Sequence, residues 1–276
     1  MEESRERDVA LTAARDAGKL IRDNVNQSKR VSTKTSESDL VTDIDKRAEE
    51  LIRNHILQAF PDHNILGEES VEPGTEGLTH ALAETQEARH SWIIDPIDGT
   101  TNFVHGFPFF CVSIALAERG ELKLGVVYDP IRDEWFVAEK GKGATLNGEP
   151  IRVSQEKVLS ESLLASGFPA VARGRSKNEN GFFALRREVR NIRTAGSAAM
   201  LLAYVAAGRL SGFWEIDLNV WDVAAGVLLV EEAGGRVSDT LGRPYDLSVR
   251  HILATNGLIH DHTVNALKKT GTTGFE

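Results

Sequence analysis

The sequence contains a single cysteine, Cys111, among 276 residues. One cysteine excludes an internal disulfide and any metal site built from cysteines alone, and such usage is typical of a reducing cytosol. We therefore expect a cytoplasmic protein. Because Cys111 lies within the apolar run 109–116, we interpret it as an inert core residue.

Long apolar runs and an excess of positive charge are also missing. The longest apolar runs, such as residues 223–230, are too short to cross a bilayer, and the first two dozen residues are rich in charge. We expect neither a signal peptide nor a membrane span. The 32 Lys and Arg are outnumbered by 41 Asp and Glu, giving a formal charge of −9. This balance argues against general binding to nucleic acid or to a membrane surface.

Hydrophobic periodicity predicts helices first and strands afterwards. Apolar stripes predict helices over residues 4–25 and 43–59, with a polar loop over 32–39 between them. Four strand-like runs separated by turn signals then predict an antiparallel meander; they cover residues 92–94, 110–117, 123–128 and 134–138. The glycine-rich stretch 141–148 predicts more turns and a domain boundary near residue 150.

After residue 150, strand and helix patterns alternate, which favours an α/β part with a mostly parallel or mixed sheet. Strands are predicted over residues 163–167, 191–194, 212–216 and 251–255, and helices over 197–207, 222–233 and 259–268. We therefore expect an α+β part over residues 1–150 and an α/β part over 151–276.

Several acidic motifs could carry chemistry, although each has an ordinary structural explanation. Asp95 and Asp98 lie in Asp-Pro-Ile-Asp-Gly, which is also a good β-turn sequence. Glu68 lies in an acidic loop. Asp222 precedes an apolar helix and could be its N-cap, worth about 0.5–2 kcal/mol. Asp45 follows Thr42 in a pattern similar to a capping box.

Taken together, Glu68, Asp95, Asp98 and Asp222 predict a cation site. Their small or apolar neighbours suggest partial burial. One pair of like charges 4 Å apart costs about 4 kcal/mol at an effective dielectric of about 20, so four gathered carboxylates need cations or raised pKa values. No histidine or cysteine lies among them, which favours Mg²⁺ or Mn²⁺ over Zn²⁺.

Three segments closely resemble the inositol monophosphatase family: residues 67–70, 92–105 and 221–226, the last followed by 231–237. Their order and separations match from Lys34 to about Asp239. The resemblance implies a layered α-β-α-β-α sandwich with an antiparallel sheet in the N-terminal half and a mixed sheet in the C-terminal half. It also implies a lithium-sensitive phosphatase with two or three Mg²⁺ ions, which uses activated water without a covalent intermediate, and a homodimer.

The resemblance further implies a role for each matching residue. One ion would be held by Glu68, Asp95 and the backbone carbonyl of Ile97, and the next by Asp95, Asp98 and Asp222. Asp45, Thr100 and Glu68 would orient the attacking water, and Asp98 would also belong to the catalytic and substrate-binding residues. The remaining assignments are phosphate binding by Gly99 and Thr100, substrate contacts by Gly196, Ser197, Ala198 and Glu215, and a loop position near the metals for Lys34.

The continuation Thr-Thr-Asn-Phe-Val-His after Gly99 looks most like the inositol branch of the family, which implies inositol-1-monophosphatase activity on a small phosphorylated polyol or sugar. Fructose 1,6-bisphosphate, histidinol phosphate and nucleotide phosphates stay open as substrates. A haloacid-dehalogenase-like site is excluded because Pro96 occupies the place of its nucleophile.

A regulatory binding protein is an alternative of another class. It would use a cluster of basic residues over 173–193, although an exposed helix and loop face explains the same charges. The cluster consists of Arg173, Arg175, Lys177, Arg186, Arg187, Arg190 and Arg193.

Overall fold

The computed structural model describes residues 2–25, 27, 31–33, 40–71, 75–168 and 172–274. These residues form eight α-helices: α1 (Glu2–Asn24), α2 (Asp43–Ala59), α3 (Thr75–Glu87), α4 (Thr100–His105), α5 (Ala172–Leu185), α6 (Ala198–Ala206), α7 (Val220–Glu232) and α8 (His260–Lys269). Lys34, predicted to lie in a loop near the metals, is outside the described residues.

The strands fall into three sheets. A two-stranded sheet pairs β1 (Val31–Thr33) with β2 (Leu40–Thr42). The seven-stranded sheet has the order β3 (Asn64–Gly67), β4 (His90–Asp98), β5 (Cys111–Glu118), β6 (Glu121–Asp129), β7 (Glu134–Glu139), β8 (Gly143–Leu146), β9 (Glu149–Pro150). The five-stranded sheet has the order β11 (Asn191–Arg193), β10 (Leu163–Ser166), β12 (Gly212–Ile216), β14 (His251–Thr255), β13 (Arg236–Asp239).

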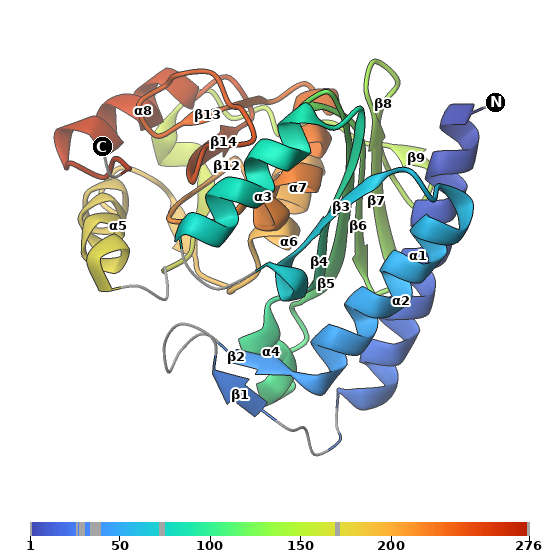
Figure 1. Cartoon of the computed structure of the whole chain (residues 1–276). Coiled ribbons are helices and arrows are strands. Elements are labelled where there is room, and N and C mark those ends of the chain that lie inside the picture. The colour runs from blue at the N-terminus through green and yellow to red at the C-terminus, as the bar shows by residue number, and fades with distance from the viewer. Residues whose placement is uncertain are drawn as a thin grey trace.

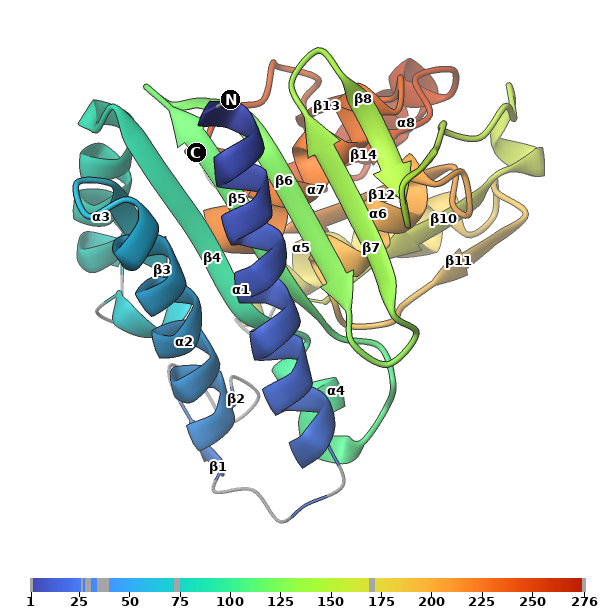
Figure 2. The same ribbon diagram turned by 90° about the vertical axis from the view of Figure 1, so that its right-hand side faces the viewer.

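The seven-stranded sheet contains the predicted antiparallel meander, from β4 to β7. At its edge β3 pairs parallel to β4, which makes the sheet mixed. Alternation along β4 sends Trp92 and Ile94 to the face covered by α1 and α2, and Ile93 to the opposite face. Figure 2 shows α1 and α2 lying across the first of these faces.

Helices α6 and α7 fill the space between the two large sheets, and α5 and α8 cover the outer face of the five-stranded sheet (Figure 1). The predicted α-β-α-β-α order is therefore confirmed. Gly226 of α7 allows the two central helices to approach closely, because an added Cβ would lie 2.5 Å from Leu202 Cβ of α6. The apolar core between the sheets draws residues from both sides of residue 150.

The structure differs from the sequence prediction at several elements, among them the unpredicted strands β1, β2, β3 and β9. The stretch 141–148 is not all turn, since its glycines flank the short strand β8. Helices α3 and α5 and strand β13 were not predicted. The buried face of α5 consists of Gly174, Asn178, Gly181 and Leu185, so this helix has no apolar stripe to detect.

Candidate active site

Strand β4 places two carboxylates on one face of the seven-stranded sheet. Asp98 follows Asp95 by three positions, so a regular strand would send them to opposite faces. The register instead shifts between them: Asp95 lies opposite Ser113 and Asp98 opposite Cys111. A β-bulge therefore absorbs one residue, and both side chains face the layer of α6 and α7.

Asp95 lies at the centre of a group of acids that are buried or half-buried. It is 2% exposed, and its Oδ1 accepts the Ile97 N–H at 2.9 Å. Its carboxyl is also within hydrogen-bonding reach of Glu68. Burial, together with repulsion from Glu68, Asp98 and Asp222, raises the pKa of Asp95 well above its usual value. The four carboxylates predicted as a cluster are thus brought together.

Asp98 is bound to the N-terminus of α6, on the other side of residue 150. Its Oδ2 accepts the Ser197 hydroxyl at 2.6 Å and the Ala199 N–H at 2.7 Å, and its Oδ1 accepts the Ala198 N–H at 3.3 Å. Burial raises the pKa of Asp98 to about 6, while these bonds favour the ionised form. The Ser197 hydroxyl and the Ala198 amide, predicted to contact substrate, are therefore already bonded to Asp98.

Asp222 is not the N-cap that one interpretation of the sequence suggested. Helix α7 begins at Val220, so Asp222 lies in its first turn and its Oδ2 accepts the Asn219 N–H at 2.6 Å. This bond holds the carboxylate on the helix end, beside the other acids. Burial, followed by repulsion from Glu68 and Asp98, raises the pKa of Asp222 well above its usual value.

Asp45 is the third residue of α2, as Asp222 is of α7, and it forms the predicted capping box with Thr42. Its Oδ2 accepts both the backbone N–H and the hydroxyl of Thr42, at 2.9 and 2.5 Å. Its Oδ1 accepts the Thr100 hydroxyl at 3.0 Å, and that hydroxyl also lies 3.1 Å from the carbonyl oxygen of Ile97. One carboxylate thus caps a helix and orients a predicted site residue.

Gly99 and Thr100 form the junction between β4 and the short helix α4. Gly99 has φ 101°, and an added Cβ would lie 3.1 Å from the Phe109 carbonyl oxygen and 3.2 Å from that of Gly196. The position therefore favours glycine for both its conformation and its surroundings. The first amides of α4 have no partners within the helix, as at any helix N-terminus.

Asn102 joins this junction to the second half of the chain, and the sequence analysis gave it no role. Its side-chain amide donates to the carbonyl oxygens of Phe109 and Ala195, both at 2.6 Å, and lies 3.3 Å from that of Gly196. The signal was its place inside the motif 92–105. Without the fold, however, nothing pointed to residue 195 as its partner.

Glu215 lies inside the site rather than at an exposed strand end. It is 8% exposed on β12, and its carboxyl lies against the backbone of Gly167. Burial, followed by repulsion from Asp98, raises the pKa of Glu215 to about 8. Glu215 also repels Asp222, so it lies near that end of the acid cluster as well.

The donor chemistry of the acid cluster fits hard divalent cations. The cluster offers carboxylate oxygens and the nearby carbonyl of Ile97, which are the ligands Mg²⁺ and Mn²⁺ prefer. Burial and mutual repulsion raise the pKa values of Asp95, Asp98 and Asp222, so their anionic forms need a positive charge nearby.

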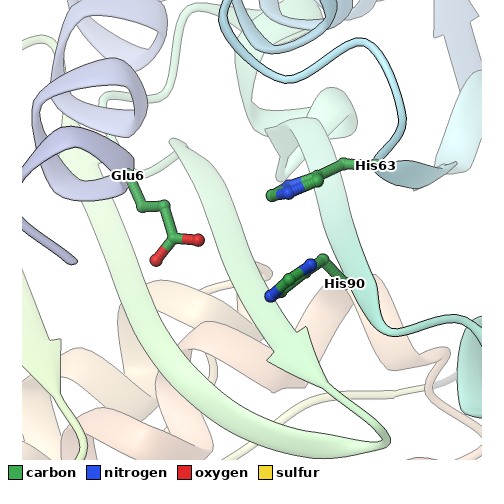
Figure 3. A group of neighbouring side chains, drawn as sticks. All are labelled: Glu6, His63 and His90. Carbon is green, nitrogen blue, oxygen red and sulfur yellow. The ribbon is translucent and has the colours of Figure 1, made fainter. Parts of the chain in front are cut away.

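A second group of potential ligands lies elsewhere, between α1 and the start of β4. Glu6, His63 and His90 each bring one ligand atom within 4.8 Å of the others, and Figure 3 shows the Glu6 carboxylate facing both rings. The rings stack, with centroids 4.4 Å apart and 21° between their planes. Trp92 Nε1–H donates to His63 Nδ1 at 3.0 Å.

Two features make this group a poor metal site. Nitrogen lone pairs lie in the ring plane, so two nearly parallel rings cannot both point at one ion between them. The Trp92 bond occupies the Nδ1 lone pair of His63, which leaves the proton of the neutral ring on Nε2. We therefore assign the group to packing between α1 and the sheet.

The other residues weighed from the sequence lie outside the cluster or at its edge. Cys111 is fully buried, with Sγ 3.9 Å from Asp98 Oδ2, and burial raises the pKa of its thiol, as expected for an inert cysteine. His105 is exposed. The described side chains of the basic cluster are exposed except Lys177, which donates to the carbonyl oxygens of Thr273 and Gly274.

Within the part of the chain that the structure describes, none of the helices combines the length and apolar character needed to cross a bilayer.

Comparison with known proteins gives consistent matches over nearly the whole chain. A sequence model of the inositol monophosphatase family matches residues 2–272. Inositol monophosphatase 2 of Solanum lycopersicum is 45% identical, covering 95% of this chain and 98% of that protein. Nus factor SuhB of Pseudomonas aeruginosa is 44% identical over 90% of each chain. The solved structure of an IMPase of Thermotoga maritima superposes with a TM-score of 0.86 at 38% identity, covering 96% of this chain and 98% of that one.

Proposed function

The chain belongs to the inositol monophosphatase family, and on that premise we propose that it hydrolyses a phosphate monoester of a small polyol, inositol 1-phosphate first among them. The observation that carries the proposal is the convergence of the buried Asp95 and Asp98 with the half-buried Glu68 and Asp222 in one acid cluster. Phosphate release should be measured from inositol 1-phosphate, fructose 1,6-bisphosphate, histidinol phosphate and a nucleotide phosphate. Release from none of them in Mg²⁺ would contradict the proposal.

The ions that fit the cluster are two or three Mg²⁺. Glu68, Asp95 and the Ile97 carbonyl would hold one, and Asp95, Asp98 and Asp222 the next. When bound, Mg²⁺ supplies positive charge that makes water more acidic and stabilises negative charge on the phosphate and the leaving oxygen. Residues 1–150 then contribute most of the ligands, and residues 151–276 contribute Asp222 and the contacts to the alcohol.

Asp45 and Thr100 would orient the attacking water. The Thr100 hydroxyl proton is directed at Asp45 Oδ1 or the Ile97 carbonyl, so the lone pairs of the hydroxyl oxygen face outward as acceptors. A water held between these lone pairs and Glu68 has its own oxygen directed at the phosphorus. The amides of Gly99 and Thr100 would stabilise charge on the phosphate.

Glu215 and the segment of Gly196, Ser197 and Ala198 would select the alcohol part of the substrate. Glu215 is buried beside Asp98, and a carboxylate there can accept hydrogen bonds from polyol hydroxyls. This placement supports a polyhydroxylated substrate over a featureless ester.

We further propose lithium inhibition, a homodimer and a cytoplasmic location, all three from family membership. A weakly held ion among Asp95, Asp98 and Asp222 would be the one displaced by lithium. Rates measured in LiCl, with KCl at the same ionic strength as the control, test this point. Equal rates in the two salts would contradict it.

A regulatory binding role is the second candidate. Its support is the exposed arginines of the basic cluster and the relative named Nus factor SuhB. The double variant R186E/R187E should keep phosphate release and lose an acidic partner in a pull-down. Retention of the same partner by that variant would end this proposal.

A further inference from the structure

A second acidic residue of α2 lies where the apolar stripe of that helix would continue. Glu49 is 3% exposed and follows Asp45 by one helical turn, so both project from the same face. Ala48 and Ile52 beside it are fully buried. Burial raises the pKa of Glu49. A charge in such a place is costly unless it makes specific hydrogen bonds.

The bonds of Glu49 go to the short turn that carries Glu68. Its Oε2 accepts the Glu69 N–H at 2.7 Å, and its carboxyl also interacts with the Ser70 hydroxyl. The same hydroxyl lies 3.1 Å from the Gly67 carbonyl oxygen, so its one proton is shared between these two acceptors. Glu49 therefore lies against the turn Glu68–Ser70 and bonds its second and third residues.

Gly67 shows how closely the carboxylate fits. An added Cβ at Gly67 would lie 2.5 Å from Glu49 Oε1 and 2.6 Å from Oε2. The φ of Gly67 is −114°, which any residue can adopt, so conformation does not demand glycine here. The Glu49 carboxylate is what leaves no room for a side chain.

We propose that Glu49 is a positioning residue that holds Glu68 against Asp95 and so determines the affinity of the site for its divalent cation. The inference rests on the proposed function, because it needs Glu68 to be a metal ligand. Helix α2 then supports the site twice: Asp45 orients Thr100, and one turn later Glu49 fixes the backbone beside Glu68.

Glu49→Ala tests this directly, with Glu50→Ala as the matched control, since Glu50 is an exposed acid on the same helix. Mn²⁺ binding to the metal-free protein, followed by the EPR signal of the free ion, should weaken about tenfold in Glu49→Ala, the loss typical when a residue supporting a ligand is removed. The Mg²⁺ concentration for half-maximal rate should rise similarly, while KM at saturating Mg²⁺ stays near wild type. Glu50→Ala should match wild type throughout.

Two further variants keep the test decisive if Glu49→Ala does not fold. Glu49→Gln retains an oxygen for the Glu69 N–H and should bind Mn²⁺ nearly as wild type does. Gly67→Ala should weaken Mn²⁺ binding, because the added methyl would displace the Glu49 carboxylate from its place beside the turn.

Unchanged Mn²⁺ binding in Glu49→Ala, or in Gly67→Ala if the first variant is unfolded, would overturn the inference. A wild-type protein that binds no Mn²⁺ and releases no phosphate would instead overturn the proposed function.

Discussion

Two groups of side chains in the described part of the chain bear on metal binding: the acid cluster, recognised by the repulsion between its carboxylates, and the group of Glu6, His63 and His90, in which three ligand atoms lie within 4.8 Å of one another. In the acid cluster, backbone N–H groups hold one oxygen of Asp95 and one of Asp222, and the carboxylates of both still repel their acidic neighbours. In the group of Glu6, His63 and His90, the rings stack and Trp92 bonds one of them. The second group has the residue types typical of a zinc site.

The two groups differ in whether their hydrogen bonds and ring contacts leave the side chains able to bind a cation. In the acid cluster, hydrogen bonds fix the direction of carboxylates whose charges remain uncompensated, so a cation relieves repulsion. In the histidine group, stacking turns the ring nitrogens' lone pairs away from a common point, and the Trp92 bond occupies Nδ1 of His63. The rings are therefore poorly placed to bind one metal ion together. Spacing of suitable residues is thus weaker support for a metal site than repulsion between fixed charges.

Of the changes considered, removal of metal should have the largest effect on activity, because only the acid cluster is expected to need a cation. Activity should vanish in excess EDTA and return with Mg²⁺ more readily than with Ca²⁺, which is larger and more loosely coordinated. The measurement is phosphate release against added metal. Full turnover in EDTA would mean that the acid cluster works without a cation.

Asp222→Asn should reduce kcat by orders of magnitude and leave the melting temperature of the metal-free protein unchanged or higher. The amide oxygen can still accept the Asn219 N–H, so the helix end is kept, while one repelling charge is lost. Kinetics and thermal melting of the same preparation check both parts. Retained activity with a lower melting temperature would reduce Asp222 to a helix-capping residue.

Glu215→Gln should weaken kcat/KM for inositol 1-phosphate by about ten- to a hundredfold, the equivalent of a charged hydrogen bond of about 1.5–3 kcal/mol. Cations in the neighbouring cluster favour the ionised carboxylate, which the amide cannot replace. p-Nitrophenyl phosphate has no polyol hydroxyls and should be affected much less. Equal losses on both esters would place Glu215 in the metal or phosphate machinery.

His90→Ala should have the smallest effect. We expect unchanged Mg²⁺-dependent rates and a loss of about 1 kcal/mol in the free energy of unfolding, the order of one aromatic contact. Calorimetric titration with Zn²⁺ should not distinguish the variant from wild type. Tighter Zn²⁺ binding by the wild type would show that the histidine group is a metal site after all.

Much of the fold could be predicted from sequence, because the apolar periods are regular. The convergence of the four acids was predicted from the ordered set of motifs and its family resemblance, since each motif alone has a structural explanation. Helix α2 has the predicted bounds, 43–59. The capping role of Asp45 was also visible in the local sequence, whereas its pairing with Thr100, 55 positions away, was implied by the family resemblance alone. Glu49 was missed because a single glutamate on a helix is usually solvent-facing.

Hydrogen bonds between residues far apart in the chain could not be predicted from the sequence either. Asp98 with Ala199, and Asn102 with Ala195, depend on how α6 meets the end of β4. Helix α5 was missed for another reason, since glycines and Asn178 line its buried face. Local patterns predict elements, whereas contacts between distant elements decide which side chains meet.

Because of the bulge in β4, the number of residues between Asp95 and Asp98 is as important to the site as the identity of the two acids. Asp95 and Asp98 share a face because the register shifts by one position between them. Removing Pro96 would leave every proposed ligand in the sequence and a strand free to pair regularly with β5. The two aspartates would then lie two positions apart and still share a face, but the bulge that directs the Ile97 N–H at Asp95 Oδ1 and the Ile97 carbonyl at the Thr100 hydroxyl would be lost. Insertions and deletions here would therefore be more damaging than most substitutions, and a design that transplants this site must keep its spacing along with its residues.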